Sequence, residues 1–147
     1  MIIRRKDGTI LSDYERYLDL SDQDAREADF RGVSIFGGDL SDSDLRASDF
    51  SGAHLEGTFC YRANCSECDF TGALLEGVAL DRVNLDNATF VDARLVADSI
   101  GGVCTLRATD LRFAVLANAV FTGCKYDSFT LFPDGFDPVA KGMVRES

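Results

Sequence analysis

The sequence of 147 residues has no tryptophan, two prolines and one histidine. With His54 as the only histidine, a metal site built from several histidines is excluded, and a serine–histidine–aspartate triad would depend on this one residue. No run of 18 apolar residues occurs, so no transmembrane helix is expected. The first residues, MIIRRKDGTIL, contain apolar runs of only two or three residues, so no secretory signal peptide is expected.

Basic residues are also few: 15 lysines and arginines stand against 25 aspartates and glutamates, giving a net charge of −10. Such an acidic surface repels phosphate backbones, so we expect no direct nucleic-acid binding. It attracts basic protein surfaces. The five cysteines are an odd number for a disulfide-stapled protein. We interpret them as reduced thiols and predict a cytoplasmic location without membrane association.

The clearest pattern that is present is a period of five residues. Large apolar residues or cysteine occupy every fifth position: Phe30, Ile35, Leu40, Leu45, Phe50, Leu55, Cys60, Cys65, Phe70, Leu75, Leu80, Leu85, Phe90, Leu95 and Ile100. Nearly all residues two positions before them are small. A helix needs apolar spacings of three and four, and a simple strand needs two. A period of five predicts a chain that turns a corner every five residues, with one large and one small side chain pointing inward from each side.

Phenylalanine repeats at a longer interval of 20 residues, at Phe30, Phe50, Phe70 and Phe90, and Leu111 is expected to continue this column. Four sides of five residues make one coil of square cross-section, so the rings should stack along one wall. A single coil cannot bury its own interior, but stacked coils bury a continuous core. With coils spaced about 4.8 Å apart, five coils make a rod core roughly 24 Å long.

Three of the clearest repeats read Ala28-Asp29-Phe30-Arg31-Gly32, Ser48-Asp49-Phe50-Ser51-Gly52 and Cys68-Asp69-Phe70-Thr71-Gly72. This pattern resembles the pentapeptide-repeat family, whose motif is roughly A(D/N)LXX. The resemblance covers residues 28–127 and implies an all-β fold, a right-handed quadrilateral β-helix of about five coils. The later LFPDGFDP segment is similar to the C-terminus of short bacterial members, cyanobacterial ones among them.

The open ends of such a rod are exposed edges that need covers. Residues 1–27 are predicted to form an N-terminal cap, with a hairpin over 2–11 that turns at Asp7-Gly8. A short helix is predicted from the capping-box spacing at Ser12 to about Leu20. Residues 128–147 are predicted to form a C-terminal cap and tail that folds over the last coil.

The register of the repeat slips at Gly101-Gly102 and resumes at Leu106. We interpret the slip as a one-residue bulge, with Asp98 and Ile100 still at inward positions. A deliberate kink or a loop that contacts a partner is the alternative.

The spacing of three cysteines is compatible with an iron–sulfur cluster. Cys60, Cys65 and Cys68 have the C-x4-C-x2-C spacing of plant-type iron–sulfur ferredoxins. The same spacing follows from the five-residue period, so we predict buried thiols with no cofactor and no metal. Cys104 and Cys124 should stack in successive coils, close enough to form a disulfide only under oxidising conditions.

Two sets of outward side chains are candidates for binding a partner. Four aspartates are predicted to form a column on the phenylalanine wall, with Thr89 between the last two: Asp29, Asp49, Asp69 and Asp110. An aspartate at this position can bond the turn backbone, whereas a column of like charges also suggests a binding surface. Phe36, Phe59 and Tyr61 occupy outward positions that are normally polar and form the second candidate set.

These features predict a non-enzymatic interaction or scaffold protein that binds another protein, as a monomer or as a homodimer joined through a cap or a wall. No base–nucleophile set is present, and we interpret His54 as a surface residue. The alternative comes from the resemblance. Quinolone-resistance members of the family are thought to imitate duplex DNA and bind DNA gyrase, so the column implies an acidic DNA mimic directed at gyrase or another DNA-binding protein.

Overall fold

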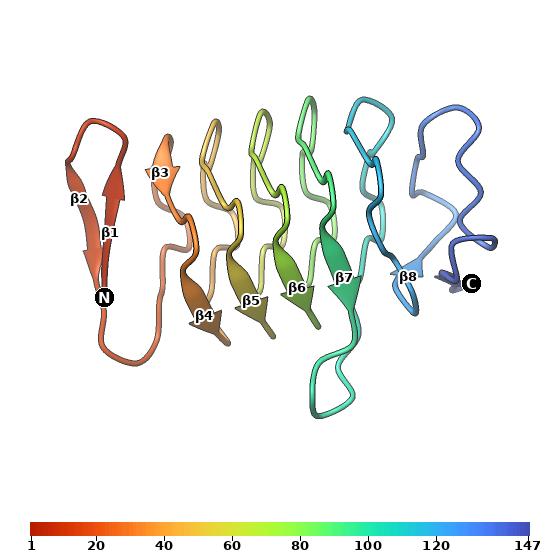
Figure 1. The fold of residues 1–147 in the computed structure, drawn as a ribbon, viewed down its shortest axis with the longest axis horizontal. Helices are drawn as coiled ribbons and strands as arrows, with labels where there is room; N and C mark the ends of the chain where they lie inside the picture. Colours follow the sequence, from red (N-terminus) through yellow and green to blue (C-terminus); the bar gives the residue numbers. More distant parts are fainter.

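Parallel pairing, mostly between residues 20 positions apart, organises the central part of the chain, and the computed structural model, which describes residues 1–147, is a rod of stacked coils (Figure 1). One side of the rod is a parallel sheet in the order β4-β5-β6-β7. Its strands are β4 (Ser34–Phe36), β5 (His54–Glu56), β6 (Leu74–Glu76) and β7 (Arg94–Val96). The fold is the predicted right-handed quadrilateral β-helix.

The four sides are numbered here by the outward residues that pair between coils. Wall 1 contains Asp19, Asp39, Phe59, Ala79, Thr105 and Lys125. Wall 2 contains Asp24, Asp44, Asn64, Asn84, Asp110 and Leu131. Wall 3 contains Asp29, Asp49, Asp69, Thr89 and Val115. Wall 4 consists of β4 to β7 and is continued by Val120, which pairs with Arg94.

The interior is filled by the residues that the five-residue period selects. Behind wall 3, the rings of Phe30, Phe50, Phe70 and Phe90 stack with centroids 4.4, 4.9 and 4.8 Å apart, as predicted. At most corners the chain turns sharply by placing one residue at positive φ, for example Gly52 at 65°. Glycine adopts this conformation without the steric cost that a Cβ imposes.

The N-terminal end is covered by a hairpin of β1 (Ile2–Arg5) and β2 (Ile10–Asp13). Strand β1 also pairs antiparallel with β3 (Ala28–Asp29), so the hairpin occupies part of the edge of the first coil. The helix predicted from Ser12 to Leu20 is wrong, because the structure contains no helix. None of the chain therefore forms a helix that is long and apolar enough to cross a membrane.

The boundary predicted at residue 28 is also too late. Asp19 already pairs with Asp39, and Leu20 and Ala25 are buried at positions that continue the period of five. Burial of these side chains outweighs the capping-box signal, because a helix would remove them from the core.

The interruption near Gly101 is larger than one residue. Ala79 pairs with Thr105, 26 residues away rather than 20, so six residues are inserted. They form a loop that projects beyond β7 (Figure 1). Ile100 is 91% exposed in this loop, so its predicted inward position is wrong. The predicted position of Leu111 is wrong as well, since Thr89 pairs with Val115 and places Leu116 after Phe90.

The C-terminal end is closed by two phenylalanines from the turn-rich tail. Phe136 packs edge-on against Phe121 at 5.7 Å, and Phe132 packs edge-on against Tyr126 at 5.4 Å. The two capping rings stack on each other at 5.1 Å. Strand β9 (Val144–Arg145) then pairs in parallel with β8 (Lys125–Tyr126) at the edge of the last coil.

Candidate binding surface on wall 3

Three of the four predicted aspartates form a column on wall 3, where Asp29 pairs with Asp49 and Asp49 with Asp69. Each carboxylate accepts a hydrogen bond from the backbone N–H two residues further on, at 3.1, 2.9 and 2.9 Å respectively. These are Asx turns, in which the side chain satisfies a corner amide. The column therefore has a structural role in shaping the corners, whatever else it does.

Arginine neutralises much of the acidic surface around this column. Asp29 is held by Arg31 at 2.8 Å, and Asp44 is held in the same way by Arg46 at 2.7 Å. The hydrogen bonds from Arg31 lower the pKa of Asp29 below its usual value. Asp49 and Asp69 have no salt bridge. The uncompensated charge on the wall 3 column is therefore confined to these two carboxylates.

Asp110 does not belong to this column. It pairs with Asn84 on wall 2 and forms its own ion pair with Arg112 at 2.7 Å. The displacement follows from the insertion of six residues where the sequence predicted a slip of one. The difference of five residues is one side of the coil, so every later residue lies one wall away from its predicted wall. Sequence reasoning missed this because the inserted segment contains Ile100, which mimics the next apolar residue of the period.

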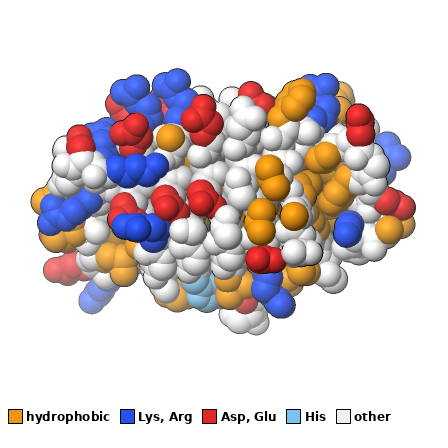
Figure 2. All heavy atoms as spheres, turned by 45° about the horizontal axis from the view of Figure 1, so that its top comes forward, with side chains coloured by type: hydrophobic (Ala, Val, Ile, Leu, Met, Phe, Trp, Pro, Cys, Tyr) orange, Lys and Arg blue, Asp and Glu red, His pale blue; other side chains and the backbone are white.

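The same face becomes apolar toward the C-terminus. Phe113 is 64% exposed, Val115 is 48% exposed and Leu131 is 41% exposed. These three residues, called the apolar patch below, lie on wall 2, wall 3 and the corner between them. Figure 2 shows charged side chains gathered over the N-terminal half of this face and hydrophobic side chains over the other half. Sequence reasoning missed this patch, although the available signal was that Phe113 and Val115 occupy outward positions of the repeat that resumes at Leu106.

The predicted aromatic residues do not form a single patch. Phe59 on wall 1 stacks on Tyr61 at 5.8 Å. Phe36 lies at the end of β4 on wall 4, where it packs edge-on against His54 at 5.6 Å. The corner between walls 4 and 1 separates Phe36 from the other two side chains.

The repeat motif is recognised by a family model. The model of pentapeptide repeats matches residues 18–52 and 63–96, in eight copies. The chain is a pentapeptide-repeat protein. The matched copies begin at Leu18, in agreement with the first buried coil, and end at Val96, where the inserted loop begins.

A solved structure shares the fold of this pentapeptide-repeat protein. A pentapeptide repeat protein from the cyanobacterium Cyanothece 51142 superposes with a TM-score of 0.67 at 23% identity, over 80% of this chain and 88% of that one. For one from the Arabidopsis thaliana thylakoid lumen the TM-score is 0.49 at 23% identity, over 76% and 66% of the two chains. For QnrB1, a plasmid-mediated fluoroquinolone resistance protein, it is 0.41 at 20% identity, over 88% and 60%. No curated protein sequence matches the chain.

Wall 4 of this pentapeptide-repeat protein carries a cluster that sequence reasoning missed. His54 Nε2 lies 2.5 Å from Glu76 Oε2, and Glu56 lies beside them in register with Glu76. The available signal was the 20-residue interval between the two glutamates, which places one above the other. The three side chains offer ligand atoms within 4.8 Å of one another.

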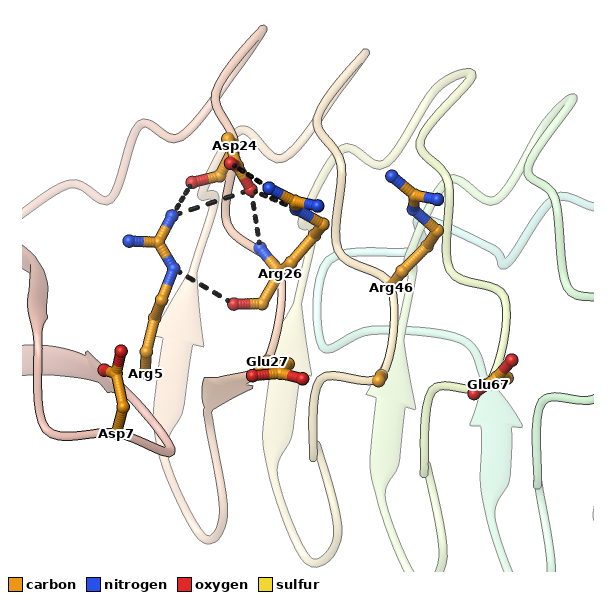
Figure 3. Close-up of a pocket in the computed structure, with 8 residues that line it drawn as sticks. Arg5, Asp7, Asp24, Arg26, Glu27, Arg46 and Glu67 are labelled. Atoms are coloured by element: carbon orange, nitrogen blue, oxygen red, sulfur yellow. Dashed lines mark hydrogen bonds and ion pairs between the residues drawn. The ribbon is translucent and has the colours of Figure 1, made fainter.

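The largest surface hollow, about 600 Å³ in volume, is strongly charged (Figure 3). It lies where the N-terminal hairpin meets wall 2, and its lining includes Arg5, Asp24 and Arg26. Arg5 donates to the carbonyl oxygen of Asp24 at 2.6 Å and Arg26 bonds the Asp24 carboxylate at 2.8 Å. The contacts of Arg5 with Asp24 attach the hairpin to the rod.

The five cysteines are free thiols buried in the core. Burial raises the pKa of the Cys60 thiol to about 12. A hydrogen bond between Cys65 and Cys68, together with burial, raises the pKa of Cys65. Cys104 and Cys124 occupy successive coils, as predicted, and Lys125 N–H donates to the Cys104 carbonyl at 2.9 Å.

Proposed function

We propose that this pentapeptide-repeat protein is a non-catalytic binding scaffold that docks another protein on wall 3. The observation that carries the proposal is the juxtaposition of two unpaired carboxylates, Asp49 and Asp69, with the apolar patch on one rigid face (Figure 2). Exposed apolar side chains bordered by charge are typical of protein-interaction surfaces. The matching partner surface is basic beside an apolar area.

Charge density favours this function over DNA mimicry. Duplex DNA carries one negative charge per about 1.7 Å along its axis. The column on wall 3 has two unpaired carboxylates in adjacent coils, about 4.8 Å apart, and its next members are Thr89 and Val115. A protein that recognises a long phosphate array finds too few charges on this face.

The cellular compartment is part of the proposal. Five unpaired cysteines are typical of proteins in a reducing environment, which supports a cytoplasmic location.

The test is affinity capture from native lysate with wild-type protein and three variants. The first variant combines Asp49→Asn and Asp69→Asn, and the second is Val115→Glu, which places a charge in the apolar patch. The third, Glu15→Gln, removes one negative charge from the N-terminal cap and serves as the control. We expect one partner to be retained by wild type and control and lost from both wall 3 variants.

Two results contradict the proposal. A partner retained equally by all four proteins places the docking surface elsewhere. A DNA-binding protein that is lost with the aspartate variant, yet retained by Val115→Glu, favours DNA mimicry instead.

A further inference from the structure

Wall 4 presents three metal-ligating side chains on two neighbouring strands. His54 and Glu56 both belong to β5 and point to the same side, because alternate residues of a strand share a face. Glu76 lies on β6 directly opposite Glu56 in the parallel register. The side chains of His54 and Glu76 are 32% and 25% exposed, so the cluster is partly sheltered and still open to solvent.

The charges of this cluster differ from those of the arginine–aspartate pairs, and, unlike the unpaired Asp49 and Asp69, one of its carboxylates bonds an imidazole. Aspartates on walls 2 and 3 such as Asp29 and Asp44 are held by arginine, whereas neither Glu56 nor Glu76 has a lysine or arginine partner. Two carboxylates directly opposite each other in a sheet repel. The only group bonded to either that can carry positive charge is the His54 imidazole. The imidazole is therefore the only counter-charge that the protein itself places beside these two carboxylates.

We propose that His54, Glu56 and Glu76 bind a divalent transition-metal ion of the Zn²⁺ class. Imidazole suits zinc, copper and nickel, whereas calcium and magnesium prefer oxygen ligands alone. Zinc takes nitrogen and oxygen ligands at about 2.0–2.2 Å, so tetrahedral geometry places the ligand atoms roughly 3.3–3.6 Å apart. The three atoms here already lie within 4.8 Å of one another, so side-chain rotations on fixed strands suffice.

The surroundings limit the movement of the ligands. Phe36 packs edge-on against the imidazole at 5.6 Å and covers its side toward β4. Ser99, from the inserted loop, donates its hydroxyl to Glu56 Oε1 at 3.0 Å. Hydrogen bonds of this kind orient carboxylate ligands in metal sites. A bound ion would join β5 directly to β6 and fix the carboxylate on which the loop rests.

The test is a calorimetric titration of tag-free protein, stripped of metal by a chelator, with Zn²⁺. We expect one ion per chain for wild type and a loss of affinity of about 10- to 100-fold or more for His54→Gln and for Glu76→Gln. Glu67→Gln is the matched control, because it removes an exposed glutamate from a corner between other walls. Circular dichroism and thermal melting verify that each variant is folded.

Two further readouts need no variant. Because His54 is the only histidine, its imidazole gives a single set of ring signals by NMR, which should shift as Zn²⁺ is added. The melting temperature of wild type should rise with Zn²⁺ concentration, since an ion that binds only the folded state stabilises it.

The proposal is overturned if His54→Gln binds Zn²⁺ as tightly as wild type, or if the imidazole signals do not move. It is also overturned if Co²⁺ used as a probe produces thiolate charge-transfer absorption that persists in His54→Gln, because the buried cysteines are then the ligands.

Discussion

Asp98 lies directly against the α-carbon of Gly77, 21 residues earlier in the chain: a methyl group on that carbon would be 2.5 Å from Asp98 Oδ2. The same carboxylate accepts hydrogen bonds from the backbone N–H groups of Ile100 and Gly102, at 3.0 and 2.6 Å. The inserted loop is thus closed by one side chain, which also seats it on the preceding coil.

The contact between Asp98 and Gly77 predicts that Gly77→Ala destabilises the protein more than Gly57→Ala. Both glycines have similar positive φ values, 61° and 59°, but nothing lies within 4 Å of a methyl group at Gly57. Both variants therefore lose about 1–2 kcal/mol of stability from placing a Cβ at positive φ. Gly77→Ala should lose a further ~1–3 kcal/mol because its methyl group displaces the loop. Urea unfolding measures the difference, and equal losses would show that the loop does not rest on Gly77.

The phenylalanine stack predicts a graded response to Phe→Leu substitution. Phe50 stacks on two rings, whereas Phe30 stacks only on Phe50. Each aromatic pair contributes about 0.5–1.5 kcal/mol beyond buried area, so Phe50→Leu should cost more than Phe30→Leu by about that amount. Thermal or urea unfolding of the two variants decides; equal destabilisation would mean that ring stacking adds nothing to burial here. Leu116 already follows Phe90 in this column, so leucine fits the site.

Periodicity predicted the core well because each inward position is chosen by burial alone. Phe50 and Leu55 are buried because they are apolar residues at the fifth positions of the repeat. The 20-residue interval then predicts the wall on which each of them lies. The loop escaped prediction because Ile100 keeps the apolar rhythm by chance while its backbone leaves the coil. Asp110 was then assigned to the wrong wall. The cluster around His54 depends on which outward residues lie next to each other in neighbouring coils. The five-residue period of buried apolar residues does not predict such contacts.

The arginine–aspartate pairs predict a loss of stability in acid. Hydrogen bonds from Arg46 and Arg112 lower the pKa of Asp44 and Asp110 in the folded state. The unfolded chain, with ordinary aspartate pKa values near ~3.9, then binds more protons than the folded chain in acid. This part of the stability is complete above the unfolded pKa and is lost as pH falls through the folded values.

The urea concentration at the unfolding midpoint should therefore decrease as the pH is lowered from 5 to 3. This range covers roughly one unit on either side of the ordinary aspartate pKa. Asp44→Asn should reduce this pH dependence, and Asp134→Asn, which alters a carboxylate without a salt bridge, serves as its control. A midpoint that is constant over this range would contradict a stabilising role for the pairs.

The buried cysteines predict thiols that are inert in the folded protein. Burial keeps Cys60 protonated by raising its pKa to about 12, and thiol reagents attack the thiolate. The pKa of Cys104 is instead lowered by a hydrogen bond with Cys124, so its protection comes from burial alone. Because all five thiols are buried, they should react with a thiol reagent at neutral pH only in denaturant. Labelling followed by mass spectrometry counts the reacted sites with and without urea. Rapid labelling of any cysteine in the folded protein would show that its coil opens locally.

The position of the inserted loop has a consequence for how such chains change over time. The chain leaves the coil after Val96 and returns before Thr105 with six extra residues, yet Ala79 and Thr105 still pair as if the chain had made a plain turn. A corner is therefore a place where sequence can grow without disturbing the layers on either side. New surface features can be acquired there one segment at a time, while the stacked interior remains as it was.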